Sequence, residues 1–106
     1  MPLIATRINI MRLDKRESRR RWREMTAMVN AWDPIGLIEM GAPLDEYDCV
    51  VGDVIRALER KESPEQLATF LSAHIAEHFG VAPGDPGPFA RQAVAWYASR
   101  WPDSHV

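Results

Sequence analysis

The sequence predicts an all-α protein, a compact bundle of about four helices with an ordered Pro/Gly loop between the first two. Apolar residues recur every three or four positions in four segments, at about 14–32, 46–61, 64–79 and 89–101, which is the period of one face of an α-helix. Proline and glycine lie between these segments, where they interrupt helices. A chain of 106 residues has the size of one domain. We therefore expect a single helical domain over 1–106, with 1–12 as a disordered extension or Met11 as an alternative start.

The first helix is expected to begin with a capping box formed by Asp14 and Glu17. It should end before Asp33-Pro34, because the residue that precedes a proline avoids the helical conformation. Its apolar face holds Trp22, Met25, Val29 and Trp32. The segment 33–44 contains two prolines and two glycines but also several apolar residues, so we expect a loop that lies on the core.

The second helix is predicted to be capped by Asp45 and to bury a stripe of Tyr47, Val50, Val51, Val54, Ile55 and Leu58. Ser63, Pro64 and Gln66 have the spacing of a capping box with proline in the first turn, and Gly80 suits a left-handed helix end. The segment 81–88 is predicted to be a linker without helix. We expect the core to include Trp22, Trp32, Leu58, Phe70, Leu71 and Trp96.

Composition excludes several classes of protein. Hydrophobic residues make up 46% of the chain, which is too many for a disordered protein. One cysteine, Cys49, cannot form an internal disulfide, and no apolar run is long enough to span a membrane. The net charge of −2 argues against a dedicated nucleic-acid binder, which is usually basic. We expect a cytoplasmic protein.

The pentapeptide from His74 to His78, with Glu77 between them, has the pattern H-x-x-E-H of a family of zinc proteases. Two histidines one turn apart can share a Zn²⁺, but the short remainder of the chain offers few candidates for a third ligand. We favour two histidines at the edge of an amphipathic helix. We therefore expect no catalytic residue, no metal and no cofactor, with a metal-dependent hydrolase using His74, Glu77 and His78 as an alternative.

Charges are unevenly distributed along the sequence. Seven acids and no lysine or arginine lie from Glu24 to Asp53, so the local field is expected to be negative. A surface for a basic protein, a capped helix with a solvated end and a cation site all remain open, although the acids lack the spacing of a calcium loop. The candidate partner-binding residues are Asp33, Glu39, Asp45, Glu46, Asp48 and Asp53.

A second charged segment is basic. Seven of the thirteen positive residues lie between Arg12 and Arg23, and five of them share one helical face: Lys15, Arg16, Arg19, Arg20 and Arg23. A solvated face is the favoured interpretation, and contact with phosphate or an acidic partner is the alternative. This gives a third function class, a nucleic-acid accessory protein.

The segments Asp-Pro-Ile-Gly at 33–36 and Asp-Glu-Tyr-Asp at 45–48 together resemble the pattern of a family of small, uncharacterised bacterial proteins. The similarity extends from about Trp22 to Gly80. It implies an all-helical fold and, because some relatives resemble proteins encoded beside toxins, an immunity or antitoxin-like role. We therefore predict a small protein-binding module that binds a basic partner, such as a toxin or effector, through its acidic loop.

Overall fold

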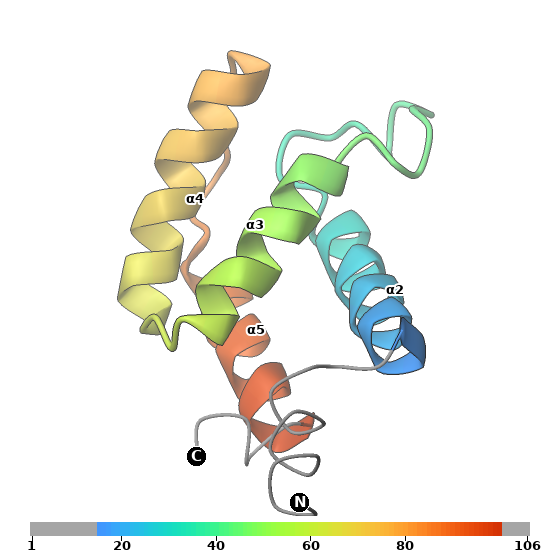
Figure 1. Ribbon diagram of the computed structural model, residues 1–106. Coiled ribbons are helices and arrows are strands. Elements are labelled where there is room, and N and C mark those ends of the chain that lie inside the picture. Colours follow the sequence, from blue (N-terminus) through green and yellow to red (C-terminus); the bar gives the residue numbers. More distant parts are fainter. Residues whose placement is uncertain (1–14, 101–106) are drawn as a thin grey trace, which may run out of the picture.

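The computed structural model describes residues 15–100, which contain four α-helices (Figure 1). These are α2 (Lys15–Trp32), α3 (Asp48–Glu59), α4 (Pro64–Phe79) and α5 (Gly87–Arg100). The all-α class and the four predicted segments are confirmed. The expected extension 1–12 and the capping residue Asp14 lie outside the described residues.

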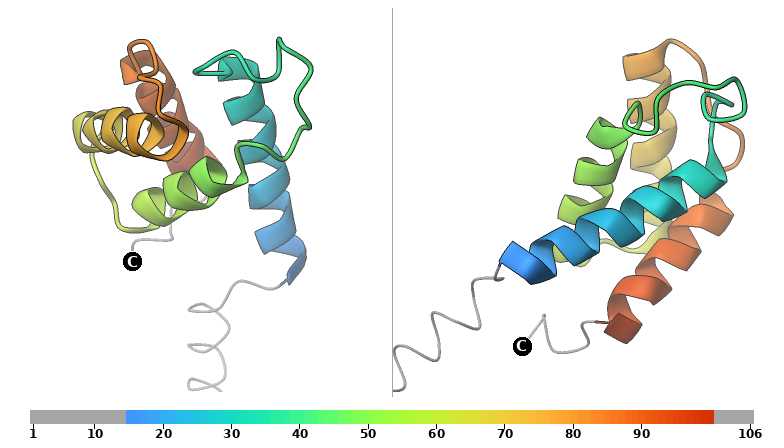
Figure 2. Two further views of the ribbon diagram at one scale, coloured as in Figure 1. Left: turned by 90° about the horizontal axis from the view of Figure 1, so that it is seen from above. Right: turned by 90° about the vertical axis from the view of Figure 1, so that its right-hand side faces the viewer.

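The helices pack as two pairs, α2 with α3 and α4 with α5, and α3 connects the two pairs. Helix α2 packs against α3, α4 packs against α5, and α3 also contacts both α4 and α5. Viewed from above, α2 lies on one side of the bundle and α4 and α5 lie on the other, with α3 between them (Figure 2). Helix α2 therefore forms one edge of the described structure and carries the loop 33–47 beyond its C-terminal end.

Medium-sized aliphatic side chains form the core. The apolar stripes predicted from the 3.6-residue period converge between the helices, because each amphipathic helix must bury one face. Ala90 and Ala93 lie where α5 meets the bundle, and their short side chains permit close helix packing. The fully buried aliphatic residues are Met25, Val29, Val50, Val51, Val54, Ala57, Leu67, Leu71, Ile75, Ala90 and Ala93.

The predicted core was wrong for Trp22, whose side chain is 39% exposed. Its indole lies at the edge of the α2–α3 contact, beside Gly52. Leu58 and Leu71 are buried as predicted, whereas Trp32, Phe70 and Trp96 are half-buried against the core. Indole N–H groups need a hydrogen-bond partner, and that of Trp96 finds one at the periphery, where it donates to Glu24 Oε1 over 2.9 Å.

Helix boundaries follow the predicted capping chemistry in part. Ser63 and Gln66 form the reciprocal capping box of α4, and Gly80 ends that helix with a φ of 75°. The prediction that 81–88 contains no helix was wrong, because α5 begins at Gly87. Pro88 is compatible with this start, since a proline in the first turn removes no intrahelical hydrogen bond.

The prediction that Asp45 caps the second helix was also wrong. Helix α3 begins at Asp48, Tyr47 occupies the N-cap position, and no side chain bonds to the first-turn amides. Residues before it form successive turns, in which the amide of Glu46 donates to the carbonyl of Pro43 and the amide of Asp48 donates to that of Asp45.

Candidate interaction surface

Asp33 anchors the loop between α2 and α3. It has a φ of 47°, a conformation that Asp tolerates better than most residues. Its carboxylate accepts hydrogen bonds from the amides of Ile38 and Glu39, each at 3.0 Å, and from the Tyr47 hydroxyl at 2.7 Å. One carboxylate therefore fixes both the middle of the loop and the residue that precedes α3.

Tyr47 is the second anchor. Its side chain is 1% exposed, and its ring packs edge-on against Phe79 of α4. The hydroxyl donates to Asp33 and accepts from the amides of Ile35 at 3.3 Å and Leu37 at 3.4 Å. This uses the one donor and both acceptor sites of a tyrosine hydroxyl. The side chain thus reaches from the α3 start into the loop and satisfies amides that would otherwise lack partners.

These contacts shift the ionisation of both groups. Burial raises the pKa of Asp33, but hydrogen bonds from the Ile38 amide, the Tyr47 hydroxyl and further amides outweigh it, so the pKa lies below its usual 3.8. Burial and the hydrogen bond to Asp33 raise the pKa of Tyr47 above 10.0. At neutral pH the pair is therefore a carboxylate that accepts from a neutral phenol, which is a strong, charge-assisted hydrogen bond.

The rest of the loop is held by turns and by packing. Gly36 and Gly41 have φ values of 77° and 90°, which favour glycine because it has no Cβ. Asn30 of α2 donates to the carbonyl of Leu44 over 3.1 Å. As predicted, apolar residues of the loop lie on the core; these are Ile35, Leu37 and Ile38. The loop is a fixed part of the fold.

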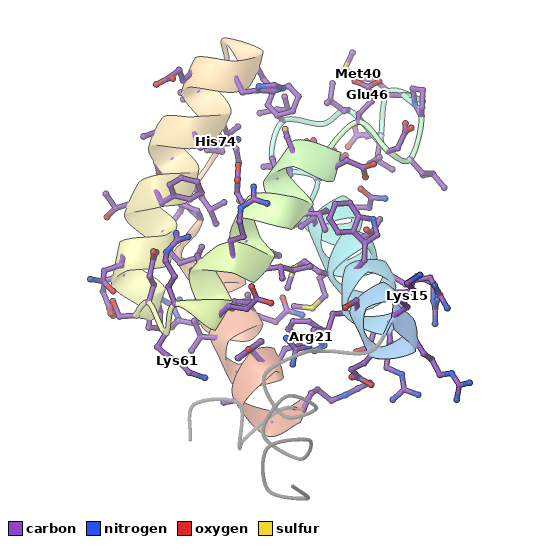
Figure 3. All side chains as sticks on the ribbon, in the orientation of Figure 1. Lys15, Arg21, Met40, Glu46, Lys61 and His74 are labelled. Carbon is purple, nitrogen blue, oxygen red and sulfur yellow. The ribbon has the colours of Figure 1, made fainter. Side chains whose placement is uncertain are left out.

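The outer side of this loop presents a mixed apolar and acidic surface. Met40 is 78% exposed and Leu44 is 67% exposed, two of the four large exposed hydrophobic residues between 15 and 100. Four exposed acids surround them in sequence, and none of the four forms an ion pair with another described residue. Figure 3 shows Met40 beside Glu46 at the tip. We call this set the loop surface: Glu39, Met40, Leu44, Asp45, Glu46 and Asp48.

Other acids of the segment are engaged within the chain. Asp33 is half-buried in the hydrogen bonds described above. Asp53 forms an ion pair with Arg56, and its carboxylate lies 3.1 Å from His74 Nε2. Glu24 accepts from Trp96 and pairs with Arg100. Of the six candidate binding residues, Asp33 and Asp53 thus have structural contacts, whereas Glu39, Asp45, Glu46 and Asp48 face outward.

The H-x-x-E-H segment lies on α4, where Nε2 of His74 is 3.1 Å from the Asp53 carboxylate. The rings of His74 and His78 stack with centroids 5.9 Å apart, and Glu77 is exposed. No group of three or more His, Cys, Asp or Glu within 15–100 is arranged to hold a metal. Burial, together with the nearby Asp53 and Asp48 carboxylates, raises the pKa of the Cys49 thiol above 9.0, which does not favour a reactive thiolate. The absence of enzymatic activity stays a prediction.

Sequence patterns grouped Arg21 with the other basic residues of α2, but it is 4% exposed. Its guanidinium lies 5.1 Å from the centroid of the Tyr97 ring and 3.5 Å from Glu59. Arg21 falls on the same helical side as Met25, four residues later, which is the pattern that would have revealed it. The remaining basic residues of the face, Lys15, Arg16, Arg19, Arg20 and Arg23, are exposed.

No protein-family model, curated protein or solved structure matches this chain. The relationship implied by the Asp-Pro-Ile-Gly and Asp-Glu-Tyr-Asp segments is therefore not tested by comparison. The contacts of Asp33 and Tyr47 explain physically why these two segments occur together. None of the helices within 15–100 is long and apolar enough to cross a lipid bilayer.

Proposed function

We propose that this chain is a small protein-binding module that binds a basic partner through the loop surface. The observation that supports this most strongly is the exposure of Met40 and Leu44 among four acids that have no ion-pair partner in the described structure. Protein interfaces commonly combine an apolar centre with a polar rim. The expected partner carries an apolar pocket or side chain surrounded by lysine and arginine.

The anchoring of the loop supports a binding role. Asp33 and Tyr47 together engage four loop amides and each other, so the loop is held in one conformation before binding. Ordering a loop during association opposes binding, and a loop fixed beforehand avoids much of that loss. The two anchors are buried or half-buried, and the residues between them carry the exposed groups.

The charge of the loop surface favours rapid association. Four exposed carboxylates occur between Glu39 and Asp48, a segment without lysine or arginine. Complementary charges raise association rates more than they raise affinity. A protein that must capture a basic toxin or effector quickly would benefit from this arrangement. The biological role that we propose on this basis is the immunity or antitoxin-like role that the resemblance implies.

A selection from a random peptide library on the immobilised protein tests the proposal and does not require the natural partner to be identified first. We expect enriched peptides to combine Lys or Arg with large apolar residues. The double variant E39K/E46K should slow association with those peptides by about tenfold or more at low salt. The variant M40S/L44S should retain the association rate and increase dissociation, because it removes the apolar centre and keeps the charge.

The double variant E65K/E77K is a matched control. It makes the same charge change at two exposed acids of α4, outside the loop surface, and should bind the selected peptides like the wild type. Both charge-reversed proteins should keep their stability within about 0.5 kcal/mol, as is usual for surface sites. Selection without enrichment, or peptides that tolerate all three variants, would show that the loop surface is a solvated connection.

A further inference from the structure

We propose that the basic face of α2, formed by Lys15, Arg16, Arg19, Arg20 and Arg23, binds the phosphate backbone of duplex DNA without sequence preference. This surface is separate from the loop surface, and the proposal does not depend on the proposed function. Three features support it: the position of the five cations on the helix, their lack of ion-pair partners within 15–100 and their distance from the acids.

The five cations cover a broad side of one helix. At 3.6 residues per turn they span an arc of about 140°, and the arc lies opposite the buried side that carries Met25, Val29 and Trp32. All five are exposed. Helix α2 forms an edge of the described bundle, and its outer side faces away from α3 (Figure 2). Figure 3 shows the side chain of Lys15 directed outward at the start of the helix.

None of the five forms an ion pair with another residue in 15–100. The acid that a sequence would place beside them, Glu24, is directed to α5, where it contacts Trp96 and Arg100. Glu17 is half-buried and lies at the edge of the arc. Carboxylates within 15–100 therefore leave most of the positive charge of this face uncompensated.

The net charge of the chain differs in sign from the local charge of the basic face of α2. From Arg19 to the end of α2 at Trp32 the helix extends about 20 Å, and the loop surface lies beyond that end (Figure 1). Charges separated by more than about 8–10 Å in solvent are largely screened at physiological salt. The net charge of −2 argues against a dedicated nucleic-acid binder, but it averages over two surfaces of opposite charge that lie toward opposite ends of α2.

The geometry favours duplex DNA over other anions. The major groove of B-DNA is about 12 Å wide and admits one helix, and cations spread over a wide arc can reach both phosphate walls of such a groove. Four of the five are arginines, whose planar guanidinium matches phosphate geometry. Single-stranded nucleic acid is less favoured, because successive bases need several stacking aromatic residues, whereas Trp22 is the one aromatic residue between Arg12 and Arg23.

The test is fluorescence anisotropy of a labelled duplex of mixed sequence, titrated with the whole chain over a range of salt concentrations. Contacts by all five cations contribute about −4.5 to the slope of log K against log salt. The variant R19Q/R23Q should reduce the magnitude of the slope by about 1.8 and weaken binding at least about tenfold near 50 mM salt. The variant R19K/R23K, which keeps the charge, should keep the slope.

R91Q is the control, because Arg91 is an exposed cation near the opposite end of the bundle, two residues after the Phe89 that stacks on Trp32. It should leave the slope unchanged. All variants should keep the melting temperature of the wild type. Duplex binding that is absent, that does not depend on salt, or that responds equally to R19Q/R23Q and R91Q overturns the proposal.

Two further experiments test whether the basic face of α2 binds something other than DNA. Sedimentation of the protein alone would show self-association if the basic face meets the loop surface of a second copy. Sedimentation with anionic phospholipid vesicles would show membrane binding. If R19Q/R23Q abolishes either of these while the wild type does not bind duplex DNA, the assignment to DNA is wrong.

Discussion

Replacing Tyr47 by Phe tests whether the loop is held by its two anchors. The change removes the hydroxyl and keeps a ring that is 1% exposed. The lost bond to the Asp33 carboxylate, at 2.7 Å, contributes about 1.5–3 kcal/mol because one partner is charged. The bonds from the Ile35 and Leu37 amides are longer, at 3.3 and 3.4 Å, and their groups are partly accessible to water, so together they add about 1 kcal/mol.

The expected loss is therefore about 2.5–4 kcal/mol in the free energy of unfolding. Urea denaturation followed by circular dichroism measures it, and hydrogen exchange should show faster exchange at the amides of residues 35–39. Tyr97→Phe is the control, because it removes the same hydroxyl from the other tyrosine, where the bond from Arg21 is 3.5 Å long. Its cost should stay below about 1 kcal/mol. A loss below about 0.5 kcal/mol for Tyr47→Phe, within the range of an ordinary surface change, would refute the anchoring role of the hydroxyl.

Four other perturbations probe the same account. Leu71→Ala, at a fully buried position, should cost about 2–5 kcal/mol by denaturation, and a cost below about 1 kcal/mol would be incompatible with the bundle. Ser63→Ala should cost about 1 kcal/mol through loss of the capping box; an unchanged midpoint would contradict that cap. The fold lowers the pKa of Asp33, so its ionised form stabilises the folded state. This contribution to the free energy of unfolding is present above about pH 3.8 and is lost as the pH falls through the folded pKa. Asp33→Asn should thus be less stable than the wild type at pH 7, and its free energy of unfolding should change less as the pH falls. Parallel curves of unfolding free energy against pH for the two proteins would contradict this. Metal analysis should find no stoichiometric zinc, whereas about one zinc per chain that disappears in His74→Ala would favour the hydrolase.

Local chemistry explains what sequence alone could predict. Helix identity follows from the period of apolar residues, and α4 has both of its boundaries predicted because Ser63, Gln66 and Gly80 act through neighbouring backbone groups. The α3 start was missed because Asp45 does not cap it; Tyr47 stands at the N-cap, and its hydroxyl bonds to Asp33, 14 residues away. The pairing of distant residues is set by the path of the chain, which capping rules do not describe.

The same limit applies to burial. Hydrophobicity predicted a buried Trp22, which is 39% exposed, whereas Arg21, which was not among the predicted core residues, is 4% exposed. Both residues lie near the edges of the buried stripe of α2, where a small rotation of the helix decides which side chain faces the neighbouring helix. Arg21 can be buried because its guanidinium forms an ion pair with Glu59 and lies over the ring of Tyr97, where a cation–π interaction stabilises its charge.

The sequence predicted the candidate site as one acidic segment. The structure was needed to separate the acids that hold the fold from those that face solvent. Charge counting treated six acids alike, whereas Asp33 and Asp53 face inward and four acids face outward. The sequence also did not separate the apolar residues of the loop. Ile35, Leu37 and Ile38 pack on the core, whereas Met40 and Leu44 are strongly exposed. Turns at Gly36 and Gly41 determine which side chains point outward.

The most direct test of the central claim is a map of amide chemical-shift changes in the isotope-labelled chain on addition of a selected basic peptide. The loop surface is predicted to be the binding site, so the largest changes should fall between Glu39 and Asp48 and should disappear in E39K/E46K. The amides of α2 from Lys15 to Arg23 should change little. Changes that concentrate on α4, α5 or the basic face of α2, or that persist undiminished in the double variant, would contradict the claim.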